Sequence, residues 1–500
     1  MTLTAYHTAR ESRWPSSQLV PFIIIILVSL ALLIPVASSP PLLHDSFPID
    51  WVWADQFTSL LAHGNLLPRW LPLSNSGLGS PVFYYYPPGA FYLTGLFGLA
   101  GLSTYSSIMA AFGTASAASG VFTFAWLKHR SHRPLLGALF FVAAPYAWFD
   151  FTRRGALAES VAIIFVPLIA IGLRRVAERK SPLLLTISYA GMIFTHLPLA
   201  LLTSVFLILP YVLVHRRETL KFAEGGTLGI LLSSSTLLPA LALDKWREAG
   251  WLWLNPVFKP AYWSVFAHHW EVGFVLQVHL MLLTIGLAGL MLFLVRRDRW
   301  GLLAAIVCVV MAGLLPLFWS LPLMAKVQFP YRALPIAEFA LATALARVSG
   351  PDKNWLYVAG PALVLTSIFA RPPLPSSVTT IEELARDHPD ELEYLPKGTV
   401  ALDPQILSLK TAAIVKGRLP SPTVPRRIVE PHFYFPSWSC GEIEPRSKLL
   451  MHDEKCRPHI IWTGVEKLGA SLTGLAMLIL FGLTLWRARS RTPVRPRQRI

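Results

Sequence analysis

Charged residues are scarce in this chain. Asp, Glu, Lys and Arg together make up 14% of the 500 residues, whereas hydrophobic residues make up 54%, and the mean hydropathy is +0.50. A water-soluble domain could not hide that much apolar surface, even with a large core. The composition excludes an ordinary soluble domain and predicts a polytopic membrane protein.

Acidic residues are the scarcer charge, with 28 Asp and Glu against 44 Lys and Arg, so the net charge is +16. In a soluble protein this excess would suggest nucleic acid as a partner. Here the basic residues cluster between apolar runs, at 128–133, 174–180, 216–221, 296–299, 347–353 and 487–499. Cytoplasmic loops of membrane proteins carry such clusters. The basicity therefore indicates topology, and no nucleic-acid partner is expected.

Long apolar runs predict about 12 transmembrane helices, with both termini in the cytoplasm. Several runs are shorter than the roughly 20 residues that a perpendicular span needs, so they must borrow flanking residues or thin the bilayer. The first run lacks a convincing cleavage site and is expected to be retained. The runs lie at 18–38, 104–127, 134–149, 157–173, 181–195, 197–214, 223–243, 274–295, 301–320, 333–348, 355–370 and 464–486.

The apolar piece 88–101 decides this topology. If it crossed the membrane, the basic cluster 128–133 would lie outside, against the positive-inside rule. We therefore predict a re-entrant or interfacial helix at the outer face.

The fold class that follows is an all-α polytopic membrane protein with a small β-containing extracytoplasmic segment before the last helix. The strand-like runs are 399–402 and 428–435. The expected organisation is a transmembrane module at 1–370 with an outer loop at 39–103, an extracytoplasmic cap at 371–463, and the last helix with a basic tail at 464–500.

Cysteine is almost absent, with three residues in the chain. Cys308 falls inside a predicted span, whereas Cys440 and Cys456 fall in the cap. Two cysteines in an oxidising compartment commonly pair. The sequence does not fix their separation, so the pairing stays open.

The first outer loop carries three acids in a row, Asp45, Asp50 and Asp55. Asp45 lies only a few residues past the first span, where partial desolvation can tune a carboxylate as a general base. It is the predicted catalytic residue, and the neighbouring His44 is a candidate substrate contact. Asp50 and Asp55 are expected to be solvated loop acids.

Arginines on the predicted outer side are unexpected, because Lys and Arg cluster on the predicted cytoplasmic side of this chain. Their presence outside therefore needs a separate explanation. Arg153 and Arg154 occupy a short outer turn before Glu159, which should fall in the head of the next helix, and Arg332 lies at another outer helix entrance. Anchoring to lipid headgroups and binding of a phosphate both explain such arginines. Convergence of the arginines would favour phosphate, and an acid at membrane depth such as Glu159 is a functional candidate by default.

Two histidines complete the candidate substrate contacts. His196 interrupts a helical hairpin before Pro198, where a hydrogen-bonded helix end and a functional role are both open. His269 lies in an outer loop beside His268 and Glu271. Their spacing does not match a helical zinc pair, so contact of His269 with substrate is the better hypothesis.

With these residues in hand, the chain resembles the membrane glycosyltransferases of the GT-C superfold. Among these it is most similar to the bacterial 6-pyruvoyl-tetrahydropterin-synthase-related membrane proteins, akin to the YfhO-like family. The motifs that carry the resemblance are HD at 44–45, GNLLPRW at 64–70, GLGSPVFYYYPP at 77–88, RGALAE at 154–159, THLP at 195–198, QFPYR at 328–332, EYLP at 393–396 and FYFPSW at 433–438.

The resemblance implies sugar transfer from a polyprenyl-phosphate carrier to an acceptor, which is a lipid, glycan or protein, at the outer face of the bacterial inner membrane. Asp45 would act as the base, and Arg153, Arg154 and Arg332 would stabilise the departing phosphate. A divalent cation could share that work with Glu159 as ligand, or the arginines could suffice. The implied partners are the lipid-linked sugar, membrane lipids and an acceptor.

Two other function classes stay open at this point. A transporter or flippase of a lipid-linked sugar predicts charged residues through the midplane and repeated halves, and neither is clear in the sequence. A non-enzymatic assembly subunit for cell-envelope polysaccharide predicts no clustering of acids and arginines on one face.

Overall fold

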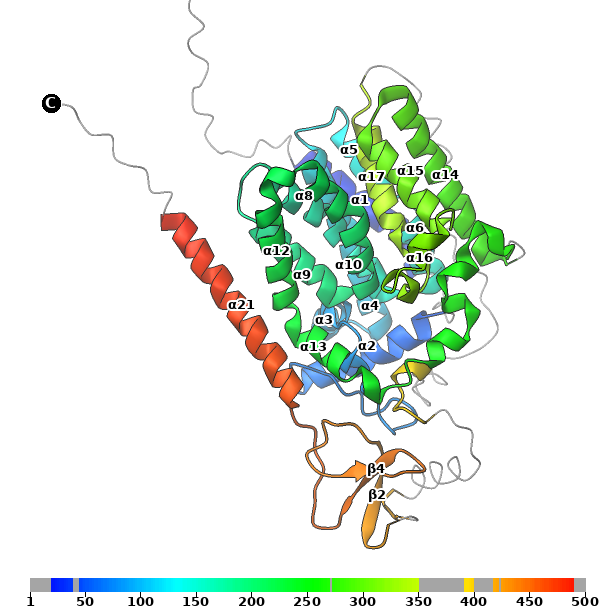
Figure 1. Cartoon of the computed structure of the whole chain (residues 1–500), viewed down its shortest axis with the longest axis vertical. Coiled ribbons are helices and arrows are strands. Elements are labelled where there is room, and N and C mark those ends of the chain that lie inside the picture. The colour runs from blue at the N-terminus through cyan, green and yellow to red at the C-terminus, as the bar shows by residue number, and fades with distance from the viewer. Residues whose placement is uncertain are drawn as a thin grey trace, which may run out of the picture.

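The computed structural model describes residues 19–38, 45–269, 272–349, 391–399, 417–421 and 424–489. Within these ranges the chain forms a helical bundle with a small antiparallel sheet at one end (Figure 1). Its principal helices are α1 Val20–Ala37, α2 Phe47–Ala62, α3 Gly89–Leu99, α4 Thr104–Leu127, α5 Pro134–Val142, α6 Pro145–Phe149, α7 Leu157–Ala162, α8 Phe165–Ala177, α9 Leu183–Thr195, α10 Leu197–Thr203, α11 Leu209–Val214, α12 Thr219–Leu232, α13 Ser234–Ala242, α14 Gly273–Arg296, α15 Arg299–Met311, α16 Pro316–Trp319, α17 Leu334–Ala346 and α21 Gly464–Arg489.

Seven helices in the described ranges are long and apolar enough to cross a membrane, or eight if one bent pair forms a single span. The seven are Val20–Ala37, Thr104–Leu127, Pro134–Arg154, Leu157–Ala177, Leu197–Val214, Gly273–Arg296 and Gly464–Trp486. The chain is thus a multi-pass membrane protein by length and composition.

The predicted number of about 12 spans is not confirmed. The runs at 181–195, 301–320 and 333–348 form helices of only 13 residues each, namely α9, α15 and α17. The run at 223–243 is broken at Ser233, where the two helices bend by 68°. The run at 355–370 lies outside the described residues. Periodicity marks apolar segments but does not reveal where a helix breaks inside one.

Five of the six basic clusters meet at one end of the bundle, as the topology predicts. The backbone N–H groups of His132 and Arg133 both donate to the carbonyl of Ala346 at 3.0 Å, which joins two of the clusters. Ion pairs join them to three further clusters: Arg130–Glu178 at 2.5 Å, Arg179–Glu218 at 3.0 Å and Arg347–Asp298 at 3.2 Å. The cluster at 487–499 lies almost wholly outside the described residues. Segments far apart in sequence thus share this basic end.

Helix α4 connects the basic end to the opposite end. Its 24 residues span roughly 36 Å at 1.5 Å per residue, from Thr104, which donates to Asp55 on α2, to Leu127 beside the basic end. The side chain of Ser103 caps the first turn by accepting from the N–H of Ser106. This cap explains why the helix begins where the predicted run 104–127 begins.

Helix α3 corresponds to the piece that was expected not to cross. It is 11 residues long, which is too short for a span. It packs on α2, where Gly98 leaves room for Thr58, and on the end of α9, where a side chain on Gly89 would overlap Thr195. The helix therefore belongs to the same end of the bundle as α2.

The cap forms a four-stranded sheet in the order β1-β2-β4-β3, all antiparallel. The strands are β1 Leu419–Pro420, β2 Arg427–Phe433, β3 Glu442–Ile443 and β4 Leu449–Asp453. The predicted strand at 428–435 corresponds to β2, whereas residues 400–402 lie outside the described residues. A small β-containing segment before the last helix is therefore confirmed.

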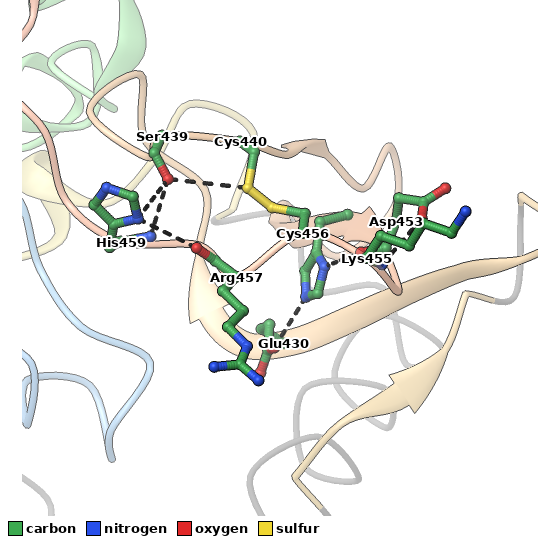
Figure 2. The surroundings of a disulfide bond; sticks show 9 residues. Glu430, Ser439, Cys440, Asp453, Lys455, Cys456, Arg457 and His459 are labelled. Carbon is green, nitrogen blue, oxygen red and sulfur yellow. Dashed lines mark hydrogen bonds and ion pairs between the residues drawn. A yellow bond between two sulfur atoms is a disulfide. The ribbon is translucent and has the colours of Figure 1, made fainter.

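Cys440 and Cys456 form a disulfide in the cap (Figure 2), which settles the pairing that the sequence left open. Beside it, Ser439 and His459 hydrogen-bond at 3.0 Å, which ties the chain after the disulfide back to the chain before it. Cys308 is free and buried in α15.

The cap is attached to the outer loop at 67–88. The N–H of Phe433 donates to the carbonyl of Leu78 at 2.7 Å, and the ring of Phe435 packs on those of Trp70 and Tyr84. The outer loop, α2 and the cap thus form one end of the molecule, opposite the basic end (Figure 1).

Candidate active site

The turn between α6 and α7 brings the first outer loop against the bundle. Residues 150–154 form a π-helical turn that ends at Gly155, whose φ is +65°. A Cβ at this position would overlap Phe47 at the start of α2, so glycine permits both the left-handed backbone and the close approach. The N–H of Ser46 then donates to the carbonyl of Arg154 at 2.9 Å. This contact holds Asp45 beside Arg154.

Glu159 is the centre of a buried polar cluster. It lies in the first turn of α7, as predicted, with 1% of its surface exposed. Its Oε2 accepts from Arg154 Nη1 at 2.9 Å and from Arg332 Nε at 3.0 Å. Its Oε1 accepts from the hydroxyl of Tyr146 at 2.5 Å, and His196 Nε2 lies 4.0 Å from Oε2. Four separate parts of the chain thus converge on one carboxylate.

Asp150 is a second buried acid at Arg154. Its Oδ1 accepts from Arg154 Nη1 at 2.7 Å and its Oδ2 accepts from the hydroxyl of Ser160 at 3.1 Å. The π-helical turn places Asp150 and Arg154 on the same face, and Ser160 follows Glu159 on α7. Arg154 is consequently fixed by acids on both sides of the turn.

The aromatic ring of Phe329 packs against the guanidinium groups of both Arg154 and Arg332. Arg154 and Arg332 lie over its ring, at 5.1 Å and 4.8 Å from the centroid, and Arg154 also lies 5.7 Å from the ring of Tyr331. Guanidinium groups stack favourably on aromatic faces. The backbone of Phe329 has a φ of +54°, an uncommon conformation for a bulky residue that marks a functional candidate.

Asp45 forms the outward boundary of the cluster. Its Oδ2 lies 3.4 Å from Arg154 Nε, and 44% of its side chain is exposed, against 3% for Arg154. Its backbone is left-handed, with a φ of +52°, which aspartate tolerates better than most residues. Asp45 is therefore the carboxylate of this cluster that a molecule from outside can reach.

The expectation that Asp50 is solvated is wrong, whereas Asp55 is exposed as expected. Asp50 is 4% exposed, and its Oδ2 accepts from the N–H of Leu157 at 2.9 Å. Burial raises the pKa of Asp50 to about 7. Both acids lie on α2, and Asp50 shares the inward face with Phe47 and Trp53 because residues three apart lie on one side of a helix.

The structure thus brings together Asp45, Arg154, Glu159, His196 and Arg332 among the predicted site residues. Arg153 does not join them in the same way, since within the described residues its buried Nε has no hydrogen-bond partner. His269 stacks on Tyr262, with ring centroids 4.1 Å apart, and its substrate role stays a prediction. His44 lies outside the described residues.

Sequence reasoning missed the residues that contact the arginines or their acids, namely Tyr146, Asp150, Ser160, Phe329 and Tyr331. One signal was available: Asp150 stands four residues before Arg154, a spacing at which opposite charges meet on a helix. The contacts of Arg154 with Phe329 and Tyr331 join segments more than 170 positions apart, which no local pattern reveals.

The surroundings of Glu159 do not fit a divalent cation. Both carboxylate oxygens accept hydrogen bonds, and two guanidinium cations lie within 3.0 Å of Oε2, so a metal ion there would meet like charge. In the described part of the chain no group of three or more His, Cys, Asp or Glu side chains could hold a metal. Among the described residues, Arg154 and Arg332 are the cations that pair with Glu159.

No protein-family model and no curated protein matches the sequence. Among solved structures the chain is similar to the arabinofuranosyltransferase AftD from Mycobacteria, as the mutant R1389S, with 18% identity and a TM-score of 0.44 over 70% of this chain and 27% of AftD. It is also similar to ArnT from Cupriavidus metallidurans bound to undecaprenyl phosphate, with 16% identity and a TM-score of 0.42 over 71% of this chain and 63% of ArnT. The similarity thus spans about a quarter of AftD and less than two thirds of ArnT. Membership of the 6-pyruvoyl-tetrahydropterin-synthase-related or YfhO-like family stays a prediction.

Proposed function

We propose that this chain is a membrane glycosyltransferase that moves a sugar from a polyprenyl-phosphate donor to a hydroxyl-bearing acceptor at the extracytoplasmic face. The observation that carries the proposal is the convergence of Arg154 and Arg332 on the buried Glu159, with Asp45 at the outward side of Arg154. Sugar transfer from a lipid phosphate needs cations that stabilise the departing phosphate and a base that takes the proton of the acceptor. The fixed guanidinium groups suit the first role, and the exposed carboxylate of Asp45 suits the second.

The proposed transfer requires two charge changes. As the acceptor hydroxyl attacks the anomeric carbon, its proton passes to Asp45 and the bond between that carbon and the phosphate oxygen breaks. The electron pair of the broken bond stays on the polyprenyl phosphate, whose negative charge grows. Arg154 and Arg332 are fixed before the reaction by Glu159 and Phe329, so little reorganisation is needed to stabilise that charge.

Two features support an extracytoplasmic orientation. The site lies at the end of the bundle that carries the cap and its disulfide, and disulfides persist in oxidising compartments. The basic clusters lie at the opposite end, which favours the cytoplasm. We propose that the protein is in the inner membrane of a bacterium, with its site facing the periplasm or exterior.

The direct test supplies the purified protein, in lipid nanodiscs, with a polyprenyl-phosphate sugar and a panel of octyl monosaccharides as acceptors. Transfer should release polyprenyl phosphate and glycosylate an acceptor. A transporter or flippase would move the lipid between leaflets without releasing phosphate, and an assembly subunit would do neither. Either of these two outcomes would overturn the proposal.

The first prediction concerns phosphate recognition. Replacing Arg332 by lysine keeps the positive charge but removes the planar fork, so donor binding should weaken by about 1–3 kcal/mol, the order of a hydrogen bond to a charged group. Donor affinity is measured by titration of nanodiscs with the lipid-linked sugar.

Arg347→Lys is the matched control, because Arg347 pairs with Asp298 at the basic end and is 46% exposed. Its donor affinity should equal that of the unmodified protein. If Arg154→Lys and Arg332→Lys both bind the donor as tightly as the control, these arginines do not bind the phosphate and serve only as buried counter-ions of Glu159.

A further inference from the structure

Helix α6 begins without a cap of its own. The backbone is extended at Ala144, with a ψ of 137°, and this break separates α5 from α6. The N–H groups in the first turn of a helix have no partner inside the helix, and an alanine side chain cannot accept a hydrogen bond from them. Pro145 has no N–H. Tyr146 is therefore the first residue of α6 whose N–H needs a partner from elsewhere.

Glu338 on α17 supplies that partner. Its Oε1 accepts from the N–H of Tyr146 at 2.8 Å, although the two residues lie 192 positions apart. Glu338 is 1% exposed, and Tyr146 is fully buried. An acid buried in the helical bundle of a membrane protein is expensive and is a functional candidate by default. The sugar transfer proposed above does not use this acid.

Tyr146 connects Glu338 to the candidate site. Its N–H donates to Glu338, and its hydroxyl donates to Glu159 at 2.5 Å. Residues four apart lie on one face of a helix, and Tyr146, Asp150 and Arg154 follow this spacing through α6 and the π-helical turn. A displacement of α6 would therefore move all three side chains relative to Glu159.

Helix α17 supports both arginines of the site. Arg332 lies in the 3₁₀ turn Pro330–Ala333, which leads directly into α17, and Glu338 follows on α17 itself. One segment of the chain thus carries Arg332 and also holds the helix that leads to Arg154. A shift of α6 against α17 would change the distance between the two guanidinium groups.

The start of α7, which carries Glu159, is held in a similar way. Its N-cap residue is again an alanine, Ala156. The N–H of Leu157 donates to Asp50 from α2 at 2.9 Å. Carboxylates from distant helices therefore hold the starts of both short helices that flank the arginine turn.

We propose that Glu338 is a positioning residue for sugar transfer, which holds α6 so that Tyr146 and Arg154 keep their places at Glu159. This role needs a side-chain oxygen that reaches the N–H of Tyr146, and it does not need a negative charge. Glutamine at this position would keep the role, whereas aspartate, which is shorter by one methylene group, would lose it. The inference rests on the proposed function, and it adds a residue that does not itself contact the substrates.

Ser119 provides a matched control for packing. It lies on α4 and, like Glu338, lines a cavity of about 10 Å³ beside α6, which is room for about one water molecule. Its hydroxyl donates to the carbonyl of Ser116 in its own helix at 2.8 Å. Ser119→Ala therefore changes the same cavity without removing a contact to the start of α6.

Hydrogen exchange of the full-length protein in nanodiscs tests the placement without any substrate. In Glu338→Asp the amides of residues 150–157 should exchange about tenfold faster than in the unmodified protein, because a loosened α6 lets the turn open more often. Glu338→Gln and Ser119→Ala should exchange like the unmodified protein. Unchanged exchange in Glu338→Asp, or equally fast exchange in Glu338→Gln and Glu338→Asp, would contradict the placement.

Kinetics test the role in the reaction, at equal amounts of folded protein. Glu338→Asp should lower kcat about tenfold or more, because a small misplacement of groups at a reaction centre is costly. The KM for octyl monosaccharide acceptors should not change, since Glu338 does not contact the acceptor. Glu338→Gln and Ser119→Ala should keep kcat within about twofold. If Glu338→Asp does not fold, Glu338→Gln decides the matter, because a tenfold loss of kcat in that variant overturns the inference.

The outcomes separate the inference from the proposed function. If Glu338→Asp transfers sugar at the rate of the unmodified protein, the inference is wrong and the proposed function stands. If the unmodified protein itself releases no polyprenyl phosphate, the proposed function fails, and the positioning role fails with it.

Discussion

Asp45→Asn should lower the turnover number for sugar transfer on the order of 100-fold or more, because an amide cannot take the proton of the attacking hydroxyl. Folding should be nearly intact. Asparagine has the size of aspartate and tolerates the left-handed backbone at this position, where φ is +52°. The side chain is 44% exposed, so the uncharged amide would still reach water. Donor affinity should change little, because Arg154 keeps Asp150 and Glu159.

Asp55→Asn is the matched control for this prediction. Asp55 lies on α2, is exposed, and accepts a hydrogen bond from Thr104, so its loss should leave turnover within about twofold, as for most surface changes. Transfer rates, expression and Tm are measured for both variants. Normal turnover in Asp45→Asn, or a loss that a fall in Tm explains, would remove Asp45 from the mechanism. Asp50→Asn is no substitute for this control, because Asp50 is buried and accepts from the N–H of Leu157.

The sequence predicted the parts of this fold that depend on local composition. The run 104–127 became α4 with the same ends, because a serine cap and short turns bound it. The charge bias correctly grouped the basic clusters, since ion pairs such as Arg130–Glu178 and Arg347–Asp298 bring them to one end. Composition acts over whole segments, so it survives errors in the boundaries of individual helices.

The broken helices and the inward face of α2 could not be predicted in the same way. A run of apolar residues can form one straight helix or two helices that bend by 68° at Ser233, and the sequence pattern does not distinguish the two. Likewise, Asp45, Asp50 and Asp55 look equivalent in a loop, and only the helix that begins at Phe47 turns Asp50 inward and Asp55 outward. The burial of a side chain depends on what packs against it, and the N–H group that Asp50 accepts from, that of Leu157, lies 107 positions away.

The candidate site, too, could be predicted from the sequence only in part. Its arginines and Glu159 were recognisable because charges are rare in this chain and expensive near a membrane. That Glu159 binds Arg154 and Arg332 directly was not recognisable, since Arg332 lies 173 positions from Glu159. The pairing changes the expected chemistry, because the arginines are held by a protein carboxylate before any phosphate arrives.

Glu159→Gln should therefore destabilise the protein strongly, by about 3–5 kcal/mol, the usual cost of removing one partner from a buried ion pair. Glutamine has the same shape but no charge. It would leave Arg154 and Arg332, which are buried in this cluster, with Asp150 as the remaining buried acid. The expected result is a markedly lower Tm in nanodiscs and a smaller yield of folded protein.

Glu178→Gln is the matched control, because Glu178 pairs with Arg130 and Lys180 at the basic end with 32% of its side chain exposed. Exposed pairs contribute at most about 1 kcal/mol, so this variant should melt close to the unmodified protein. A double variant, Glu159→Gln with Arg332→Gln, removes one charge of each sign from the cluster and should recover part of the lost stability. That recovery would separate charge balance from the loss of a single hydrogen bond. If Glu159→Gln is as stable as Glu178→Gln, then Glu159 is not the counter-ion that holds the arginines, and their fixed position at the site needs another cause.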